Sequence, residues 1–341
     1  MLKIYLYSFC SFLFLLQYAH AQKSSSKEKK TTKVRVSVWE LYDARAFADE
    51  NIYINPREIP NGKDDDKNGF VDDVYGIGFD YTEQPTNHNY TPIYDSSGKV
   101  LKRYFHGTGV TSILLRNNSN VELVGVGFLK YVDRPDEPIW LENLRKRLTG
   151  KPEEDIALLD NVFRISTAYF KAHGVKVVNI SWSADIEFFR GFLKEIGIYS
   201  DDNFEKMRTW MKLFHDSLYK IFKENPDIFF VIAAGNDNKD IEEVYAVPAI
   251  IDLPNTITVG GLDETGKNKI SFSNYGKNVK VYATATHKDV VVSSKHILPT
   301  AVGTSFATPV VTAYVAREIA NGKTFQQIKK ELIAQKYIIS K

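Results

Sequence analysis

The stretch Gly303-Thr304-Ser305-Phe306-Ala307-Thr308-Pro309 precedes a strongly apolar run over residues 310–316. The glycine lets the backbone turn tightly, and the apolar run predicts a buried helix that begins near the serine. The first turn of a helix carries free backbone N–H groups and the positive end of the helix dipole, which stabilise an oxyanion. Ser305 is therefore a candidate nucleophile for acyl transfer. A role of Thr304 or Ser305 as a simple helix cap is the alternative.

The composition of the 341-residue chain is that of a globular protein, with 43% hydrophobic and 25% charged residues. The net charge of +2 gives no reason to expect nucleic acid or an anionic surface as a partner. The only cysteine, Cys10, lies inside an N-terminal apolar segment. We therefore expect neither disulfides nor thiolate metal sites in the folded part, which has to rely on its core or on bound ions for stability.

Residues 1–21 have the features of a secretory signal peptide: Lys3 precedes an apolar run, and Ala19-His20-Ala21 forms a small-residue cleavage site. A membrane anchor is the alternative, but the apolar run over residues 5–16 is shorter than the roughly 20 residues that span a bilayer. Residues 22–33, rich in Ser and Lys, predict a short disordered lead before a domain over residues 34–341. We expect a secreted or periplasmic protein that is free of the membrane after signal cleavage.

Strand-like and helix-like patterns alternate along most of the chain. Apolar and β-branched runs predict strands over residues 34–40, 121–129, 175–182, 228–236, 256–262 and 278–285. Apolar residues at helical spacing predict helices over residues 155–173 and 204–223, one from Ser305 to about residue 320, and a last one capped by Thr324. This alternation predicts an α/β fold with a mainly parallel sheet.

Three further polar groups lie at the ends of predicted elements. Glu40 ends the first strand, Asn236 follows a strand that is apolar throughout, and His106 opens a helix beside Gly107. The carboxyl ends of parallel strands gather ligands and catalytic groups at one edge of a sheet. Carboxylate, imidazole, amide and hydroxyl are the acid, base, oxyanion donor and nucleophile of serine acyl-transfer chemistry. Each alone also has a structural explanation, as a solvated charge, a structural histidine or a turn residue.

The acidic stretch Asp64-Asp65-Asp66-Lys67-Asn68-Gly69-Phe70-Val71-Asp72 lies between Glu40 and His106. Alternating oxygen-bearing side chains, a turn glycine and a later aspartate match the first part of a calcium loop. Tyr75 stands where that pattern has its closing glutamate, so another ligand has to come from elsewhere. We expect a structural calcium ion at Asp64, Asp66, Asn68, Phe70 and Asp72, and no organic cofactor. A solvated acidic turn is the alternative.

These motifs resemble those of the subtilisin-like serine proteases, the subtilases, from residue 34 to the C-terminal helix. Residues 303–309 match the family's Gly-Thr-Ser-x-Ala-x-Pro motif in full, and Ala233-Ala234-Gly235-Asn236 matches its oxyanion strand. His106-Gly107-Thr108 matches the histidine motif, with Gly109 in place of the usual second histidine. Asn179-Ile180-Ser181-Trp182-Ser183 looks like the strand that pairs with substrate, and Ser271-Phe272-Ser273-Asn274-Tyr275-Gly276 resembles the family's Ser-Phe-Ser segment. The acidic stretch looks like a loop that many bacterial subtilases insert.

The resemblance implies a three-layer α/β fold, with helices on both faces of the sheet, and an endopeptidase that cleaves proteins or peptides. It implies that Ser305 attacks the peptide carbonyl and that His106 transfers the proton. It further implies that Glu40 orients His106 and that Asn236 stabilises the oxyanion together with the Ser305 backbone N–H. The substrate would lie as an extended strand along Ser181, Trp182, Ser183 and Ala184.

The acid departs from the family pattern. Where subtilases have Asp-Ser-Gly or Asp-Thr-Gly, this chain has Glu40-Leu41-Tyr42, and the glutamate is one methylene longer. A misplaced catalytic group can cost about a hundredfold in rate. Asp43 is a second candidate acid. A catalytically impaired pseudoprotease that binds extended peptides is therefore the alternative function, and a serine esterase or amidase of the same architecture is a third.

Overall fold

In the part of the chain that the structure describes, seven strands form the central sheet, in the order β12-β9-β8-β7-β6-β1-β4. All their pairings are parallel. In sheet order the strands are β12 (Tyr337–Ile338), β9 (Val279–Thr284), β8 (Thr256–Leu262), β7 (Phe229–Ala233), β6 (Val177–Ile180), β1 (Val34–Val38) and β4 (Val121–Leu123). The parallel sheet that the sequence predicts is confirmed.

The computed structural model describes residues 33–79, 85–87, 103–127, 145–146 and 148–340. The predicted signal peptide, residues 1–21, and residues 22–32 of the predicted disordered lead lie outside the described residues. So do residues 128–144, which include the last two residues of the strand predicted over residues 121–129. None of the described helices combines the length and the apolar character that crossing a bilayer requires.

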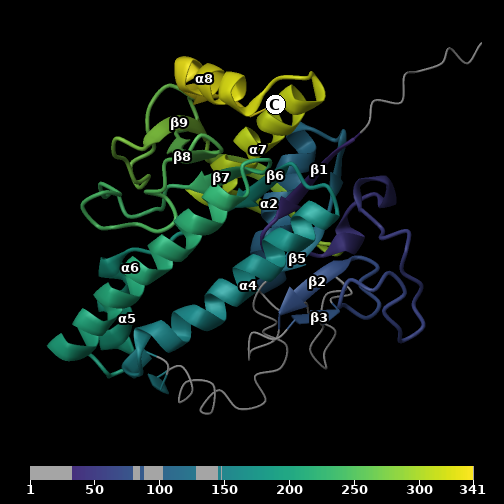
Figure 1. Ribbon diagram of the computed structural model, residues 1–341. Helices are drawn as coiled ribbons and strands as arrows, with labels where there is room; N and C mark the ends of the chain where they lie inside the picture. Colours follow the sequence, from purple (N-terminus) through teal and green to yellow (C-terminus); the bar gives the residue numbers. More distant parts are fainter. Residues whose placement is uncertain (1–32, 80–84, 88–102, 128–144, 147, 341) are drawn as a thin grey trace, which may run out of the picture. The chain divides into compact units, whose positions relative to one another are not determined.

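Helices cover both faces of the sheet (Figure 1). On one face, α2 (Arg103–Asn117), α7 (Thr304–Ala320) and α8 (Phe325–Gln335) share an apolar core with the strands. On the other face, α4 (Pro152–Ala172) and α6 (Asp201–Glu224) share a second core. Val231 of β7 belongs to the first core and its neighbour Ile232 to the second. This strand is apolar at every position because both of its faces are covered. The predicted three-layer fold is confirmed.

The predicted strand over residues 121–129 is instead two short strands. β4 joins the central sheet, whereas β5 (Gly125–Gly127) pairs with β2 (Gly76–Phe79), which also pairs with β3 (Pro85–Asn87). The chain leaves the central sheet after Val124, whose N–H donates to Val36. A Cβ on Gly76 would lie 1.9 Å from the carbonyl oxygen of Gly125, so only glycine permits this close pairing.

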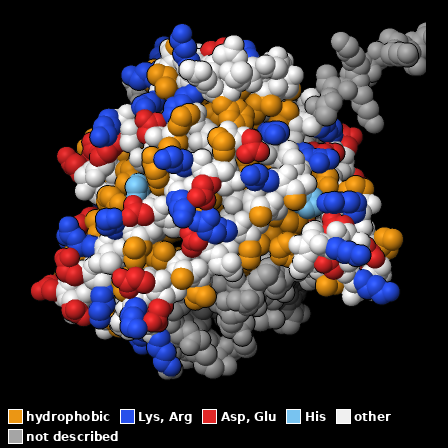
Figure 2. Space-filling model, viewed as in Figure 1, with side chains coloured by type: hydrophobic (Ala, Val, Ile, Leu, Met, Phe, Trp, Pro, Cys, Tyr) orange, Lys and Arg blue, Asp and Glu red, His pale blue; other side chains and the backbone are white. Residues whose placement is uncertain are grey.

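The remaining described elements are a helix, a hairpin and two short turns. α5 (Ile186–Glu195) packs on α6 through Leu193, Phe204 and Met207. The antiparallel hairpin of β10 (Thr286–Ser293) and β11 (His296–Val302) precedes α7. Short 3-10 turns at Ala44–Ala46 and Asp49–Asn51 follow β1. On the face drawn in Figure 2, the Lys and Arg side chains are interspersed with Asp and Glu.

Candidate active site

Ser305 lies in the first turn of α7, where the sequence predicts it. Gly303 precedes the helix with a φ of 152°, which residues that have a side chain rarely adopt. Pro309 has no N–H, so the carbonyl oxygen of Ser305 loses its usual partner within the helix. The hydroxyl of Ser181 donates to that oxygen at 2.8 Å, and the hydroxyl of Ser305 donates to the Ser181 carbonyl at 3.0 Å. This reciprocal pair ties the first turn of α7 to the end of β6.

A buried series of hydrogen bonds fixes the side chain of Ser181. The Asn179 side-chain amide donates to the Ser181 hydroxyl at 2.8 Å. The Thr312 hydroxyl, on α7, donates in turn to the Asn179 amide oxygen at 3.0 Å. Because these groups are buried, each hydrogen bond restricts its partner's orientation more strongly than it would in water. The relative position of β6 and α7 is therefore set by polar contacts as well as by packing.

Asn236 follows β7 and faces the start of α7. Its side-chain oxygen accepts hydrogen bonds from the backbone N–H and the hydroxyl of Thr304, at 2.8 and 3.0 Å. A backbone N–H can only donate, so the amide atom that faces it must be the oxygen, and this fixes the orientation of the amide. The Nδ2 end of Asn236 is thereby left as a donor, and Asn236 and Ser305 line the same cavity.

Asn274 holds the loop around Asn236 in place. Its side-chain oxygen accepts the N–H groups of Asp237 and Lys239, at 2.9 and 3.0 Å, and its amide nitrogen donates to Ala234 at 3.0 Å. The residue was not among the predicted site residues. Its signal in the sequence was the Ser-Phe-Ser segment, which Asn274 directly follows.

The carboxylate of Glu40 lies against the imidazole of His106, with 2.6 Å between Oε2 and Nδ1. Partial burial lowers the pKa of His106, but the charge of Glu40 and the hydrogen bond to it outweigh burial and raise this pKa above its ordinary value. The ring centroid of His106 is 5.6 Å from that of Phe306, the residue that follows Ser305 in α7. The serine hydroxyl donates to Ser181 rather than to His106.

Asp43, the second candidate acid, has other partners. Its side chain is fully buried and accepts the backbone N–H of Ser294 at 2.9 Å and that of Arg45 at 3.1 Å. These bonds connect the end of β1 to the turn of the β10–β11 hairpin. Glu40 therefore lies beside the imidazole of His106, whereas Asp43 joins the end of β1 to the hairpin turn.

A cavity of about 270 Å³ lies beside Ser305 and has room for one amino-acid side chain. All four residues of the predicted substrate strand line it, together with four residues that the sequence reasoning missed: Asp185, Phe188, Asp237 and Asn274. The backbone N–H and C=O of Ala184 both bond to Val247, at 3.0 and 2.8 Å. The backbone of Ala184 is therefore already paired with Val247, and Ala184 forms a wall of the cavity.

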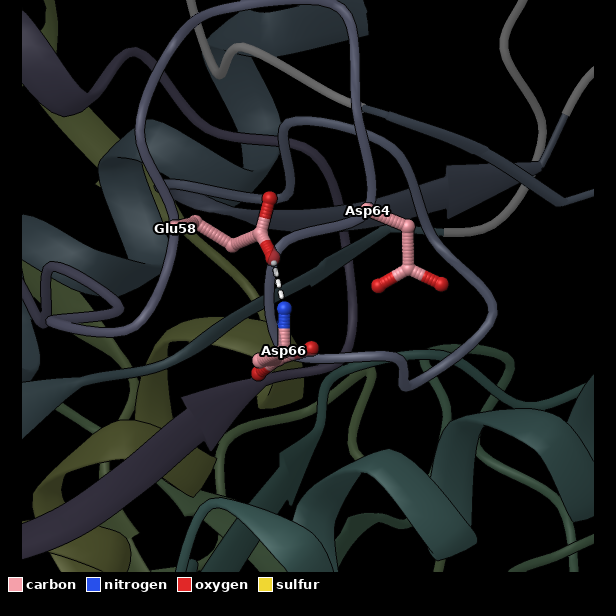
Figure 3. A group of neighbouring side chains, drawn as sticks. All are labelled: Glu58, Asp64 and Asp66. Carbon is pink, nitrogen blue, oxygen red and sulfur yellow. Dashed lines mark hydrogen bonds between the residues drawn. The ribbon is translucent and has the colours of Figure 1, made fainter.

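The acidic stretch forms a loop between β1 and β2. Carboxylate oxygens of Asp64 and Asp66 lie within 4.8 Å of each other and of a carboxylate oxygen of Glu58 (Figure 3). Carboxylate oxygens are the hard ligands that Ca²⁺ prefers, so this donor set fits the ion that the loop sequence predicts.

The other predicted calcium ligands have different partners. The carboxylate of Asp72 accepts the N–H groups of Asn61 and Gly62, at 2.9 and 3.1 Å. The side chain of Asn68 donates to Asp73 at 3.0 Å and accepts the N–H of Phe70 at 2.8 Å. Of the five predicted ligands, the structure brings the carboxylates of Asp64 and Asp66 together.

The chain matches the model of the Subtilase family over residues 66–336, which is most of its length. The chain belongs to the subtilase family. The matched range begins after Glu40, so the strand that carries the variant acid lies outside it.

The subtilase is similar to several characterised proteins over part of its length. It is 34% identical to alkaline protease 1 of Aspergillus flavus over 103 residues, 29% of this chain and 23% of that protein. It is 39% identical to a cuticle-degrading serine protease of Arthrobotrys oligospora over 99 residues, 28% of this chain and 22% of that protein. The chain thus spans less than a quarter of the length of these relatives. A solved cold-adapted subtilisin-like serine proteinase is 17% identical, with a TM-score of 0.43 over 89% of this chain and 82% of that one.

Where this subtilase departs from the family motifs, neighbouring residues differ in size to match. A Cβ on Gly127 would lie 2.1 Å from the side chain of Leu41, so glycine at 127 makes room for leucine at 41. Tyr42 is 1% exposed and belongs to the core that α2 and α7 share with the sheet. A Cβ on Gly109 would lie 3.2 Å from the ring of Phe306, which leaves little space for the usual second histidine.

Gly107 lets α2 approach the end of β1, because a Cβ there would lie 2.2 Å from the carbonyl oxygen of Leu41. We expect Gly107→Ala to lower the free energy of unfolding of the subtilase by about 1–3 kcal/mol, the usual range for overpacking. Urea denaturation measures this value.

Gly191→Ala is the matched control, since Gly191 lies inside α5 with no atom within 4 Å of the new Cβ. That change should raise the free energy of unfolding by roughly 0.5–1 kcal/mol, because alanine favours a helix over glycine. Equal effects of the two changes would contradict the close approach of α2 to β1.

Proposed function

We propose that this subtilase is a secreted serine endopeptidase that uses Ser305, His106 and Glu40 as its triad and Asn236 as its oxyanion donor. The observation that carries the proposal is the 2.6 Å hydrogen bond between Glu40 and His106 Nδ1. A carboxylate on Nδ1 leaves Nε2 to accept a proton, which is the orientation that a general base for a serine requires. The family match and the position of Ser305 in the first turn of α7 support the same assignment.

In the proposed mechanism, the Ser305 hydroxyl exchanges the Ser181 carbonyl for His106 Nε2 and then attacks a peptide carbonyl carbon. His106 takes the hydroxyl proton, and Glu40 stabilises the imidazolium that forms. The oxyanion accepts hydrogen bonds from Asn236 Nδ2 and the Ser305 backbone N–H. His106 then donates the proton to the leaving amine, and water releases the acyl group by the reverse sequence. The peptide lies along Ser181–Ser183, with one side chain in the 270 Å³ cavity.

The remaining parts of the proposal concern location and stability. We propose that residues 1–21 direct export and that residues 34–341 form the peptidase domain, which acts outside the cell or in the periplasm on proteins and peptides. A calcium ion at the acidic loop stabilises this domain. The donor set of Asp64, Asp66 and Glu58 supports the calcium site.

Active-site labelling tests the proposal. The folded, calcium-replete protein should react covalently with a serine-directed fluorophosphonate at Ser305, and tryptic mass spectrometry locates the adduct. Casein and small esters, assayed in parallel, separate a peptidase from an esterase. A folded protein that neither reacts with the probe nor cleaves casein would rule out an active protease.

A pseudoprotease is the second candidate, and two contacts favour it. The Ser305 hydroxyl donates to Ser181 rather than to His106, and Glu40 Oε1 is buried without a hydrogen-bond partner among the described residues. Such a protein would bind extended peptides in the same cavity without cleaving them. Peptide binding with a measurable dissociation constant, together with failure to label, distinguishes it from the endopeptidase.

A further inference from the structure

The cavity beside Ser305 carries two carboxylates. Asp185 and Asp237 both line it, and none of the described residues that line it is a lysine, an arginine or a histidine. Asn236 and Ser305, the proposed oxyanion donor and nucleophile, line the same cavity. A peptide whose carbonyl is held between these two residues therefore has the side chain of that same amino acid closest to the cavity. The charge of the cavity then acts on the side chain that precedes the cleaved bond.

Asp185 is buried, yet one of its oxygens has no partner. Its side chain is 4% exposed. Oδ1 accepts the N–H of Phe188 at 2.7 Å and lies 3.6 Å from Lys239 Nζ. Oδ2 forms no hydrogen bond with any of the described residues. A carboxylate oxygen is costly to bury without a donor, so Oδ2 is available to a donor that enters the cavity.

Two positive groups offset part of the charge of Asp185. One is Lys239, whose side chain is 33% exposed, so water screens this ion pair. The other is the N-terminus of α5, which Asp185 caps. The exposed side chain of Asp237 forms no hydrogen bond or ion pair with the part of the chain that the structure describes. The cavity therefore keeps a net negative charge, and Asp237 contributes most of it.

The rest of the lining suits the stem of a long side chain. The aromatic residues Trp182 and Phe188 line the cavity, as do Ala233 and Gly235. Apolar and aromatic residues pack against the methylene groups of lysine and arginine, and aromatic faces attract the positive charge at their ends. A side chain with an apolar stem and a cationic end therefore fits this lining better than an acidic side chain or one that is apolar throughout.

We propose that this cavity selects lysine or arginine as the residue that precedes the cleaved bond, with Asp237 as the main specificity-determining residue. The inference rests on the proposed peptidase function. Asp185 supports the selection through Oδ2, whereas Lys239 opposes it by competing for the same carboxylate. A hydrogen bond to a charged group is strong enough to discriminate roughly tenfold to hundredfold between a cationic and a neutral side chain.

The test uses two alanine-based peptide nitroanilides that differ in their last residue, which is either lysine or norleucine. Norleucine has a similar stem but no charge. In wild type, we expect kcat/KM for the lysine substrate to exceed that for the norleucine substrate at least about tenfold. Asp237→Asn keeps the shape of the side chain and removes its charge, so it should lower this ratio about tenfold.

Asp227→Asn is the matched control for Asp237→Asn. It removes a charge from the exposed turn before β7, at the end of that strand opposite to Asn236, and should leave the ratio unchanged. Lys239→Gln gives a change of the opposite sign: it frees the carboxylate of Asp185, so the ratio should rise. A loss of stability alone would not move the ratio in opposite directions in two variants. Cleavage with a ratio near one, or with a ratio that neither variant changes, overturns the proposal and leaves the peptidase in place.

Where no cleavage is found, a binding measurement decides. Calorimetry with Ser305→Ala and short alanine peptides that contain one lysine or one norleucine gives two dissociation constants. Tighter binding of the lysine peptide supports the proposed selection even when Ser305 fails to react with the fluorophosphonate, a failure that excludes the peptidase alone. Equal binding of the two peptides, or binding of neither at millimolar concentration, overturns the selection.

Discussion

Replacing Ser305 by alanine is expected to lower kcat for peptide hydrolysis roughly a millionfold, the fall known for subtilisin, a related enzyme. The reason is that, in the proposed mechanism, the Ser305 hydroxyl oxygen forms the bond to the substrate carbonyl. The fold should persist, because α7 is held by the hydrogen bonds of Thr304 and by its apolar face as well as by the Ser305 hydroxyl. Purified variant assayed on casein and on a peptide nitroanilide gives the ratio of the two rates.

Three comparisons sharpen this expectation. His106→Ala should cost about as much as Ser305→Ala, and the double variant should lose little more, because the two groups act as one unit. Ser200→Ala is the matched control: it removes the N-cap of α6, where the hydroxyl accepts the N–H of Asn203. It should lower stability by about 1 kcal/mol and leave kcat unchanged. Full activity in Ser305→Ala would exclude Ser305 as the nucleophile.

Replacing Glu40 by glutamine is expected to lower kcat by about 10⁴, the cost of losing the acid in a well-studied triad. Glutamine keeps the size of the side chain but removes the charge that stabilises the imidazolium. It can also present an N–H to His106 Nδ1, which favours the tautomer that cannot accept the serine proton. Single-turnover kinetics on an activated ester measures this loss directly.

The pH dependence of the residual activity of Glu40→Gln should shift in one direction. The proposed base must be neutral, so activity falls as the pH drops through the pKa of His106. Glu40 holds the pKa of His106 above its ordinary value. Removing the charge lowers that pKa, and the acid limb of the residual activity should move to lower pH. Profiles of kcat/KM against pH for wild type and Glu40→Gln report this shift.

Asp43→Asn is the matched comparison for the acid. The Asp43 carboxylate accepts the N–H of Ser294 and of Arg45, so its loss should cost about 1–3 kcal/mol of stability. The rate should stay within a few fold of wild type. If Asp43→Asn abolishes activity while Glu40→Gln retains it, Asp43 is the acid and the assignment of Glu40 is wrong.

Local pattern was sufficient for much of the fold. The apolar run that becomes β7 is buried at every residue, and the helix capped by Thr324 has the capping box with Gln327. The pairing of Glu40 with His106 could also be expected, since both lie at element ends that parallel topology brings to one edge. These features depend on residues that are close together in the sequence or on a general rule of sheet geometry.

The features that could not be predicted from the sequence depend on contacts between segments that are far apart along the chain. Nothing in the run over residues 121–129 marks Val124 as the point where the chain changes sheets. The change depends on the pairing of Gly125 with Gly76, which belongs to another strand. Glu58 stands outside the regular spacing of the loop and reaches the cluster only after folding. Asn274 acts on a loop that precedes it by many residues. The roles of these residues depend on tertiary contacts, which the periodicity of apolar residues in the sequence does not predict.

The topology of the central sheet has a consequence for when the proposed active site is complete. β1 lies between β4 and β6, and every pairing of the sheet is parallel. The chain between two neighbouring strands must therefore return to the starting end of the sheet before the second strand can pair. Chains with such high contact order fold slowly, because loop-closure entropy is lost before distant contacts form. Glu40 comes from the first strand and Ser305 from a helix near the end of the chain. The proposed triad is therefore complete only after the two ends of the chain have met, so the proposed peptidase could not cleave neighbouring chains while it is still folding.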